Sequence, residues 1–404
     1  MFTFVIVEIF TFVNMKNETK FYLDFIRLYS SFKMFELNGR YINYSHIEKP
    51  FQRLSSKFRT TIVGHSTLGI PIPSIFVGSG KIKILAWSQM HGNESTTTKA
   101  VFDLLNGFYQ NEENEFLKNI LDRCTLQIIP MLNPDGAKAY TRENANGIDL
   151  NRDAKKLTEI ESRILRSEFE RFQPDYCFNL HDQRTIFSAG DQPLPATLSF
   201  LTPAMDQARS INDSRIKSMQ VIAAIANDLH ELLPKQFGRY DDAFNDNCTG
   251  DSFQSLFVPT ILFEAGHYKG DYQREKTRKF VVAAMFSALN AIALETFNDF
   301  DFNDYFDIPE NNKLFYDVIL REAKLNGEIT DVAIQFKEVL INNKIEFVPI
   351  IEKIAPNLPF FGHKEIACGK NKVCLEGQKS LGENLVVSNI LLNDEVLAIN
   401  CENN

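Results

Sequence analysis

A histidine and a glutamate three positions apart, His91 and Glu94, lie in the segment WSQMHGNE at 87–94. Apolar residues before this segment predict a strand over 82–87, and helical spacing after it predicts a helix over 95–109. Both side chains would then lie at the carboxyl end of a strand, where α/β sheets place ligand sites. An imidazole and a carboxylate in such a turn can converge on one zinc ion. The motif alone also fits a helix start at which the dipole favours Glu94.

A catalytic zinc ion needs a third protein ligand and an open position for water. The segment NLHD at 179–182 supplies a candidate, because His181 follows a short strand predicted over 175–180. Asp182 or a backbone carbonyl could orient the His181 ring. Taken by itself, His181 also fits a surface histidine after a strand, so the prediction of a metal site depends on all three ligands together.

A loop rich in glycine, asparagine and aspartate, 133–154, separates these two segments and follows a strand predicted over 125–132. The loop contains Arg142, Asn151 and Arg152. Arginine forks bind carboxylates in bidentate fashion, and a positioned guanidinium can stabilise a developing oxyanion. An ordinary surface loop, with its arginines paired to neighbouring acidic residues, is the alternative interpretation. The position of the loop between the two metal-binding segments favours a functional role.

A carboxylate also follows another apolar strand, because Glu264 comes directly after PTILF at 259–263. Burial tends to raise the pKa of a carboxyl group, and a raised pKa suits a general base that acts on zinc-activated water. A solvent-exposed glutamate at a strand end is the alternative interpretation. The sequence thus offers three metal ligands and one base, each at a predicted strand end.

The motifs HGNE, NPDG, R-x-N-x-x-G-x-DLNR and NLHD, followed by a late strand-terminal glutamate, resemble the zinc carboxypeptidase family in type and order. The resemblance covers roughly residues 80–295. It implies one zinc ion per chain and a substrate with a free carboxylate. The implied roles are metal ligands for His91, Glu94 and His181, polarisation of the scissile carbonyl for Arg142, carboxylate binding for Asn151 and Arg152, and general base for Glu264.

Two features depart from the family pattern. The close spacing of Arg142 and Asn151 is more similar to bacterial murein-peptide amidases and cytosolic-type members than to digestive carboxypeptidases. The family often has a substrate-capping tyrosine before the final glutamate, and Tyr240 lies in about the right stretch, although with a longer spacing.

Residues 250–253 are expected to line the pocket for the substrate's terminal side chain. Asp251 could select a basic residue there, but the favoured interpretation is that it structures the loop.

The function expected from these residues is hydrolysis of a peptide or amide bond next to a free C-terminal carboxylate, as in a metallocarboxypeptidase. An N-acyl-amino-acid deacylase of the aspartoacylase or succinylglutamate desuccinylase type is an alternative, because the HGNE tetrapeptide resembles that branch too. A murein tripeptide amidase is another. A catalytically dead carbohydrate- or peptide-binding module is disfavoured, because such a protein need not retain Glu264.

The remaining sequence must supply the elements that position these residues. Predicted strands alternate with predicted helices, which indicates an α/β fold with a mixed, largely parallel twisted sheet flanked by helices. Beyond those named above, helices are predicted over 158–172, 219–233 and 276–297.

The amino-acid composition changes after about residue 300, where an acidic and aromatic stretch begins. A helix is predicted over 313–325, and segments with a strand-like pattern follow at 331–338, 344–352 and 384–399. We therefore expect three parts: an N-terminal extension over 1–33, a catalytic domain over 34–300, and a small β-rich C-terminal domain over 301–404.

Composition narrows the function classes further. The chain has 404 residues, 44% of them hydrophobic, and a net charge of -9 without a basic stripe, which argues against nucleic-acid binding.

Six dispersed cysteines fit reduced thiols in a cytoplasm, although the spacing of Cys368 and Cys374 allows one disulfide. The apolar stretch 1–13 fits either a weak export signal or a translated upstream segment with the start at Met15 or Met34. No segment reaches 18 apolar residues, so no membrane span is expected. The oligomeric state is left open.

Overall fold

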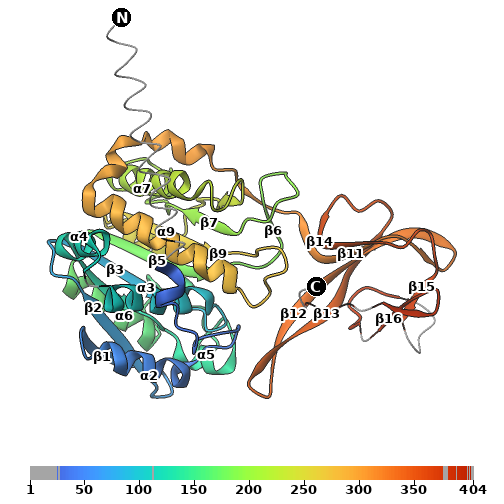
Figure 1. Cartoon of the computed structure of the whole chain (residues 1–404), viewed down its shortest axis with the longest axis horizontal. Helices are drawn as coiled ribbons and strands as arrows, with labels where there is room; N and C mark the ends of the chain where they lie inside the picture. Colours follow the sequence, from blue (N-terminus) through green and yellow to red (C-terminus); the bar gives the residue numbers. More distant parts are fainter. Residues whose placement is uncertain are drawn as a thin grey trace, which may run out of the picture.

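The computed structural model describes residues 25, 28–111, 113–375, 381–387, 389–397, 399 and 401. Its largest sheet has eight strands in the order β1-β2-β4-β3-β5-β9-β7-β8 (Figure 1). The bounds are β1 Arg59–His65, β2 Pro71–Val77, β3 Ile82–Ser88, β4 Cys124–Ile129, β5 Tyr176–Asp182, β7 Leu198–Leu201, β8 Phe237–Arg239 and β9 Thr260–Ala265. The central strands β4, β3, β5 and β9 run parallel, while the β1/β2, β2/β4 and β7/β9 pairs are antiparallel. The predicted fold class is confirmed.

Helices cover both faces of this sheet, so its strands are apolar on both sides. Along β3, Ile84 and Ala86 belong to one core while Leu85 and Trp87 belong to the other, as the two-residue period of a strand requires. The first core also includes α3 Thr96–Gln110, α4 Glu115–Arg123, α7 Asp213–Leu229 and α9 Glu275–Leu294. The second includes α6 Ile160–Phe172 and α8 Thr249–Gln254. Because the central strands β4, β3, β5 and β9 run parallel, their carboxyl ends lie along the same edge of the sheet.

The long loop predicted over 133–154 contains two short helices, α5 Pro134–Ala139 and the 3-10 helix η1 Leu150–Arg152. Asparagine or aspartate caps each of them, since Asn133 accepts a bond from the Gly136 backbone and Asp149 accepts one from Asn151. This segment is therefore ordered rather than an irregular loop, and the caps fix the direction in which its arginines leave the backbone.

The packed structure extends further toward the N-terminus than the predicted boundary at residue 34. Phe25, Tyr29 and Phe32 are buried in the main core, and the Tyr29 hydroxyl donates to Asp103 at 2.9 Å. Their spacing of four and three residues is helical, so the aromatic side chains fall on one face. The helix α2 Tyr44–Leu54 follows after a short connection.

The C-terminal region is rich in β-structure and lies beside the α/β part (Figure 1). Two 3-10 helices, η2 Thr296–Asp299 and η3 Phe302–Asp307, lead into it. Its main sheet has the order β13-β12-β11-β14, with bounds β11 Phe315–Leu325, β12 Glu328–Ile341, β13 Lys344–Ala355 and β14 Phe361–Ala367. The short strands β15 Val373–Leu375, β16 Ile390–Leu392 and β17 Glu395–Leu397 form a second sheet. In addition, β10 Asn311–Lys313 pairs with β6 Phe187–Ala189 of the α/β part.

The helix predicted over 313–325 is wrong, because this segment forms β11. Val318 and Leu320 pack into one core and Ile319 into another, so both faces of the strand are buried. An apolar run that is buried on both faces loses the alternation that marks a strand. The division of the chain at residue 300 itself stays a prediction.

Two further observations concern α9 and the cysteines. By length and composition α9 could cross a membrane, but 78% of its apolar 18-residue stretch is buried inside the fold, as in a core helix. All six cysteines are free in the part of the chain that the structure describes, so the disulfide between Cys368 and Cys374 is not formed.

Candidate metal centre and active site

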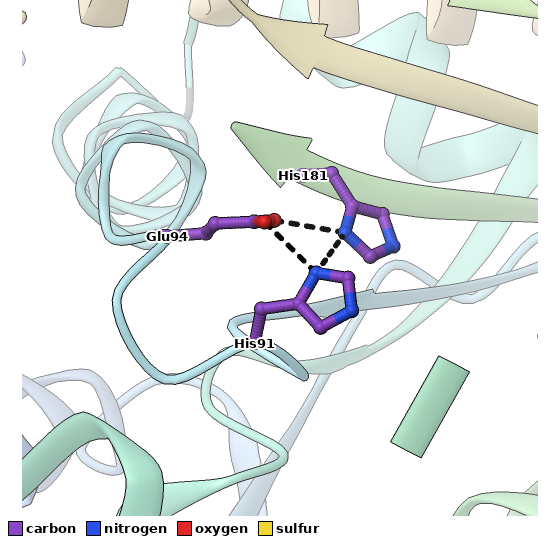
Figure 2. Close-up of side chains that lie close together, drawn as sticks. All are labelled: His91, Glu94 and His181. Carbon is purple, nitrogen blue, oxygen red and sulfur yellow. Dashed lines mark hydrogen bonds and ion pairs between the residues drawn. The ribbon is translucent and has the colours of Figure 1, made fainter. Parts of the chain in front are cut away.

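Three side chains from two strand ends meet at the edge of the central sheet (Figure 2). His91 and Glu94 follow β3, and His181 lies on β5. Their facing atoms are close: His91 Nδ1 lies 2.9 Å from Glu94 Oε1, His181 Nδ1 lies 2.9 Å from Glu94 Oε2, and the two Nδ1 atoms are 3.0 Å apart. Among the described residues these three form a group whose candidate ligand atoms all lie within 4.8 Å of one another.

Glycine allows the two motif loops to pack backbone against backbone. A Cβ atom on Gly92 would lie 1.9 Å from the carbonyl carbon of Gly136, so no side chain fits at position 92. The loops are also hydrogen-bonded, because Asn133 Nδ2 donates to Met90 O at 3.1 Å and Asn93 N donates to Thr141 O at 3.1 Å. The HGNE and NPDG motifs are thus two halves of one rigid support for the metal ligands.

Burial and charge favour the metal-binding protonation states of Glu94 and His181, whereas at His91 burial is outweighed by Glu94 and by the bond to Asp149, which raise the pKa of that imidazole. Burial would raise the pKa of Glu94, but His91 and His181 outweigh it and hold that pKa well below its usual range. Burial lowers the pKa of His181, which keeps this imidazole neutral. Asp149 accepts from His91 Nε2 at 3.0 Å and so turns Nδ1 of that ring toward the other two ligands. The sequence offers only a weak signal for this role, the aspartate of the DLNR motif.

The sequence-based hypothesis gave Asp182 or a backbone carbonyl as the group that orients His181, but Nε2 of that ring is buried without a hydrogen-bond partner among the described residues, so neither does. The Asp182 carboxylate accepts from the Thr96 and Thr97 backbone at 3.0 and 3.3 Å, while the Asp182 backbone N–H donates to Glu94 Oε2 at 3.1 Å. The first turn of α3 lacks a side-chain cap from Ser95, and this carboxylate takes the free backbone donors instead. Asp182 therefore ties the start of α3 to the end of β5.

Glu264 lies on β9 directly beside His181, because the two are register partners in the parallel pair. Its Oε2 atom is buried without a hydrogen-bond partner among the described residues. Burial raises the pKa of Glu264 well above its usual range, and the negative charges of Glu94 and Asp182 raise it further. Arg274 supports this strand end, since its guanidinium donates to Ala265 O at 2.8 Å and to Gln183 O at 2.9 Å.

Arg142 lies at the mouth of the cluster and is partly exposed. Its Nη1 lies 3.2 Å from His91 Nδ1 and 3.3 Å from Glu94 Oε1, and its Nε donates to Asp149 Oδ2 at 3.1 Å. Asp149 thereby holds both a metal ligand and the guanidinium. A carbonyl oxygen that approaches the metal ligands would meet this positive charge.

Asn151 and Arg152 lie further from the cluster and join it through Asp149, which accepts from the Asn151 backbone at 2.9 Å. The Asn151 side chain accepts from Thr249 N at 3.0 Å, at the start of α8. Arg152 is exposed, and its Nη1 contacts Asn151 O at 2.7 Å and Cys248 Sγ at 3.1 Å. Arg152 therefore contacts its neighbour Asn151 and the residue before α8 rather than the metal ligands.

Tyr240 directly follows β8 and is close enough to the site for two of its carboxylates to act on its hydroxyl. Burial raises the pKa of its hydroxyl, followed by the nearby charges of Glu264 and Glu94, and a hydrogen bond with Asn311 opposes that shift. In the segment 250–253, Phe253 is buried against Trp87 with ring centroids 5.4 Å apart, and the role of the segment in a substrate pocket stays a prediction.

The donor set fits zinc. Two imidazole nitrogens and one carboxylate oxygen are the ligands of a catalytic zinc site, which leaves a fourth position open. Ligands about 2.0–2.1 Å from a tetrahedral ion lie roughly 3.3 Å from one another. The three separations of 2.9–3.0 Å between the facing atoms are close to this value. A zinc ion bound here would have His91, Glu94 and His181 as its protein ligands.

Fold and site together define a three-layer α/β protein with a mononuclear metal centre at the carboxyl ends of its central strands. Residues 44–177 match the zinc carboxypeptidase family, which confirms the resemblance seen in the sequence. The match contains His91, Glu94 and both arginines of the loop, and it ends before His181 and Glu264.

Curated relatives match a limited part of the chain. A probable carboxypeptidase 2 of Arthroderma benhamiae is 28% identical over 134 residues, which is 33% of this chain and 24% of that protein. Gamma-D-glutamyl-L-diamino acid endopeptidase 1 of Lysinibacillus sphaericus is 29% identical over 103 residues, 23% of this chain and 26% of that protein. The chain thus spans about a quarter of the length of these relatives.

Solved structures show the same fold over a longer span. A metallo-carboxypeptidase from Burkholderia cenocepacia aligns with a TM-score of 0.51 at 18% identity and covers 63% of this chain and 70% of that chain. Carboxypeptidase A from Helicoverpa armigera aligns with a TM-score of 0.52 at 13% identity and covers 65% of this chain and 75% of that chain. At these identities the likeness establishes the fold alone.

Proposed function

We propose that this protein is a zinc-dependent metallocarboxypeptidase, which hydrolyses a peptide or amide bond next to a free C-terminal carboxylate. The observation that carries the proposal is the placement of Glu264, whose Oε2 atom is buried without a hydrogen-bond partner among the described residues, directly beside His181 of the metal-ligand set. A binding module would gain nothing from an unpaired buried carboxylate at this position, because burying such a group costs free energy.

Each residue of the site has a defined task in this reaction. A zinc ion held by the three ligands would acidify a water molecule and polarise the substrate carbonyl. Glu264 accepts the proton from that water as its oxygen bonds to the carbonyl carbon, and then passes it to the nitrogen of the departing amine. Arg142 donates to the carbonyl oxygen while negative charge develops there. The products are a shortened carboxylic acid and a free amino acid, and Glu264 is ionised again.

Specificity for a C-terminus rests on Arg152 and Asn151 in this proposal. Arg152 is exposed at the rim with Cys248 beside it, so a carboxylate of the substrate can reach its guanidinium. Tyr240 lies near Glu264 and would close over the bound substrate. The similarity to an enzyme named for gamma-D-glutamyl-L-diamino acid bonds suggests that peptides with such a linkage be included among the substrates tested.

The test uses the purified zinc-loaded protein and matched substrate pairs. Each peptide is offered with a free C-terminal carboxylate and as its amidated twin, and the released C-terminal residue is quantified. An N-acyl amino acid and a gamma-D-glutamyl-L-diamino acid peptide serve as comparison substrates. We expect release from the free carboxylate only. Equal cleavage of the amidated twin, or release of acyl groups instead of C-terminal residues, contradicts the proposal.

A further inference from the structure

A glutamate of the C-terminal sheet reaches into the wall of the metal site. Glu338 lies on β12, and its carboxylate accepts from Arg40 Nε and Nη2 at 3.3 Å. The same carboxylate accepts a hydrogen bond from the Tyr140 hydroxyl. Arg40 and Tyr140 both belong to the α/β part of the fold. One side chain of the C-terminal region therefore joins two residues that lie 100 positions apart.

The first route from Glu338 leads to the metal ligands through Arg40. Arg40 is only 5% exposed, and its Nη1 donates to Asp182 Oδ2 at 3.1 Å and to Thr96 Oγ1 at 2.8 Å. Asp182 follows the ligand His181 in the chain, and its backbone N–H donates to the ligand Glu94. A shift of the Arg40 guanidinium would thus move a residue that touches one metal ligand and adjoins another.

The second route leads through Tyr140 to the arginine at the mouth of the site. Tyr140 ends α5 in the left-handed conformation, with a φ of 57°, two residues before Arg142. The intervening Thr141 accepts from Asn93 N through its carbonyl, next to Glu94. The direction in which Arg142 leaves the backbone depends on this turn. The hydrogen bond from the Tyr140 hydroxyl to Glu338 fixes the Tyr140 side chain at the centre of this turn.

We propose that Glu338 is a positioning residue of the metal site, through which the C-terminal β-sheet holds the metal ligands and Arg142 in their working geometry. The C-terminal region then forms part of the active-site wall rather than an independent appendage. Partners that orient metal ligands from outside the coordination sphere commonly contribute about 10- to 100-fold to metal affinity or activity. We expect the lower end of this range, because Glu338 acts through Arg40 and Tyr140.

Glu338 is a suitable residue to change, because its loss leaves no buried charge unpaired. Arg40 keeps Asp182 as its partner, and the Glu338 side chain is 26% exposed. The variants are Glu338→Ala, which removes both bonds, and Glu338→Gln, which keeps an acceptor for Tyr140 but loses the charge. Glu346→Gln, at an exposed position on the neighbouring strand β13, is the matched control.

Two readouts test the proposal, and the first does not need enzymatic activity. In competition with a chelator, Glu338→Ala should bind zinc about tenfold more weakly than wild type, and Glu338→Gln should fall between them. In the peptidase assay, a readout that rests on the proposed function, kcat should fall about tenfold with little change in KM, because Arg152 is untouched. Glu346→Gln should match wild type in both.

The outcomes separate this proposal from the proposed function. If Glu338→Ala and Glu338→Gln match the control in both zinc affinity and kcat, the positioning role is overturned. If wild type cleaves none of the peptides, the proposed function fails, while the chelator competition still decides the role of Glu338. Should Glu338→Ala prove unstable, Glu338→Gln alone decides, because it retains the size and the acceptor of the native side chain.

Discussion

His181 and Glu264 are direct register partners on the neighbouring parallel strands β5 and β9. Partners in register point to the same face of a sheet, so the ring and the carboxylate share one side of the strand ends. The Oε2 atom of Glu264 is buried, and the pKa of this carboxyl group is raised first by burial and then by the charges of Glu94 and Asp182. A metal ion at the cluster would add a positive charge next to this group.

The first prediction concerns this pair. Glu264→Gln keeps the shape of the side chain but removes its ability to accept a proton. We expect kcat to fall by at least about 10²–10⁴-fold, the usual contribution of general-base catalysis, while zinc content and substrate affinity stay close to wild type. Kinetics and metal analysis on the same preparation check this. A variant that retains a tenth or more of the wild-type kcat contradicts the assignment of the base.

The second prediction concerns the metal ligands. His91→Ala and His181→Ala should each lower zinc content from one ion per chain to a small fraction, because two remaining ligands hold zinc poorly. Metal analysis after dialysis measures the effect. His65→Ala is the control, since His65 is exposed at the end of β1, which β2 and β4 separate from β3. Undiminished zinc in both ligand variants would remove the metal assignment.

His91, Glu94 and Glu264 could be predicted from the sequence because the signal for each is local. His91 and Glu94 stand in one turn after an apolar strand, and Glu264 follows another. The strand before His91 is a short apolar run with β-branched residues, IKILAW, and such a run is typical of a buried strand. The placement of the ligands at one edge then follows from the parallel arrangement of the strands.

The supporting residues could not be predicted, because their partners are distant in sequence. Arg40 is 142 residues from Asp182 and 298 residues from Glu338, and no periodicity or motif links such positions. A different limit applies to β11: burial on both faces removes the alternating pattern of a strand, so the sequence predicts a helix there. Local patterns therefore indicate the chemistry of this site, while its support depends on tertiary contacts.

The third prediction separates binding from chemistry. Arg152→Ala should remove the preference for a free carboxylate over an amidated C-terminus, with KM raised and kcat little changed. Loss of a charged contact in a partly desolvated site costs about 2–5 kcal/mol. Lys155→Ala, which removes an exposed positive charge three residues away, is the matched control. Retention of the full preference by Arg152→Ala would place the carboxylate site elsewhere.

A buried histidine pair lies between the α/β part and the C-terminal sheet. The rings of His267 and His363 have centroids 4.1 Å apart, and His363 Nε2 bonds to Thr185 O at 2.7 Å. Both nitrogens of His267 are buried without a partner among the described residues. Burial, followed by the neighbouring His363 and Arg274, holds the pKa of His267 well below its usual range. Burial lowers the pKa of His363 to about 4.

The sign of the resulting pH dependence follows from proton linkage. An unfolded histidine binds a proton below a pKa of about 6.5, whereas His267 in the fold stays neutral, so the unfolded state gains protons as pH falls. The stability that His267 contributes is complete above about pH 6.5 and is lost as pH falls below it. Between pH 7 and pH 5 this loss amounts to about 2 kcal/mol for one such group.

The fourth prediction is that His267→Phe stabilises the protein, and does so more at pH 5 than at pH 7. Phenylalanine keeps the ring contacts with His363 and Tyr272 and removes an unsatisfied buried polar group, a change worth about 1–3 kcal/mol. Denaturant unfolding at both pH values measures the two stabilities, with His65→Phe as the exposed control. The gain at pH 5 should exceed that at pH 7 by about 2 kcal/mol, because the variant no longer has this group to protonate on unfolding.

An equal gain at both pH values would mean that His267 is protonated alike in the folded and unfolded states. A loss of stability at both would mean that its nitrogens bind a partner such as water, so that the neutral, unpartnered ring inferred here is wrong.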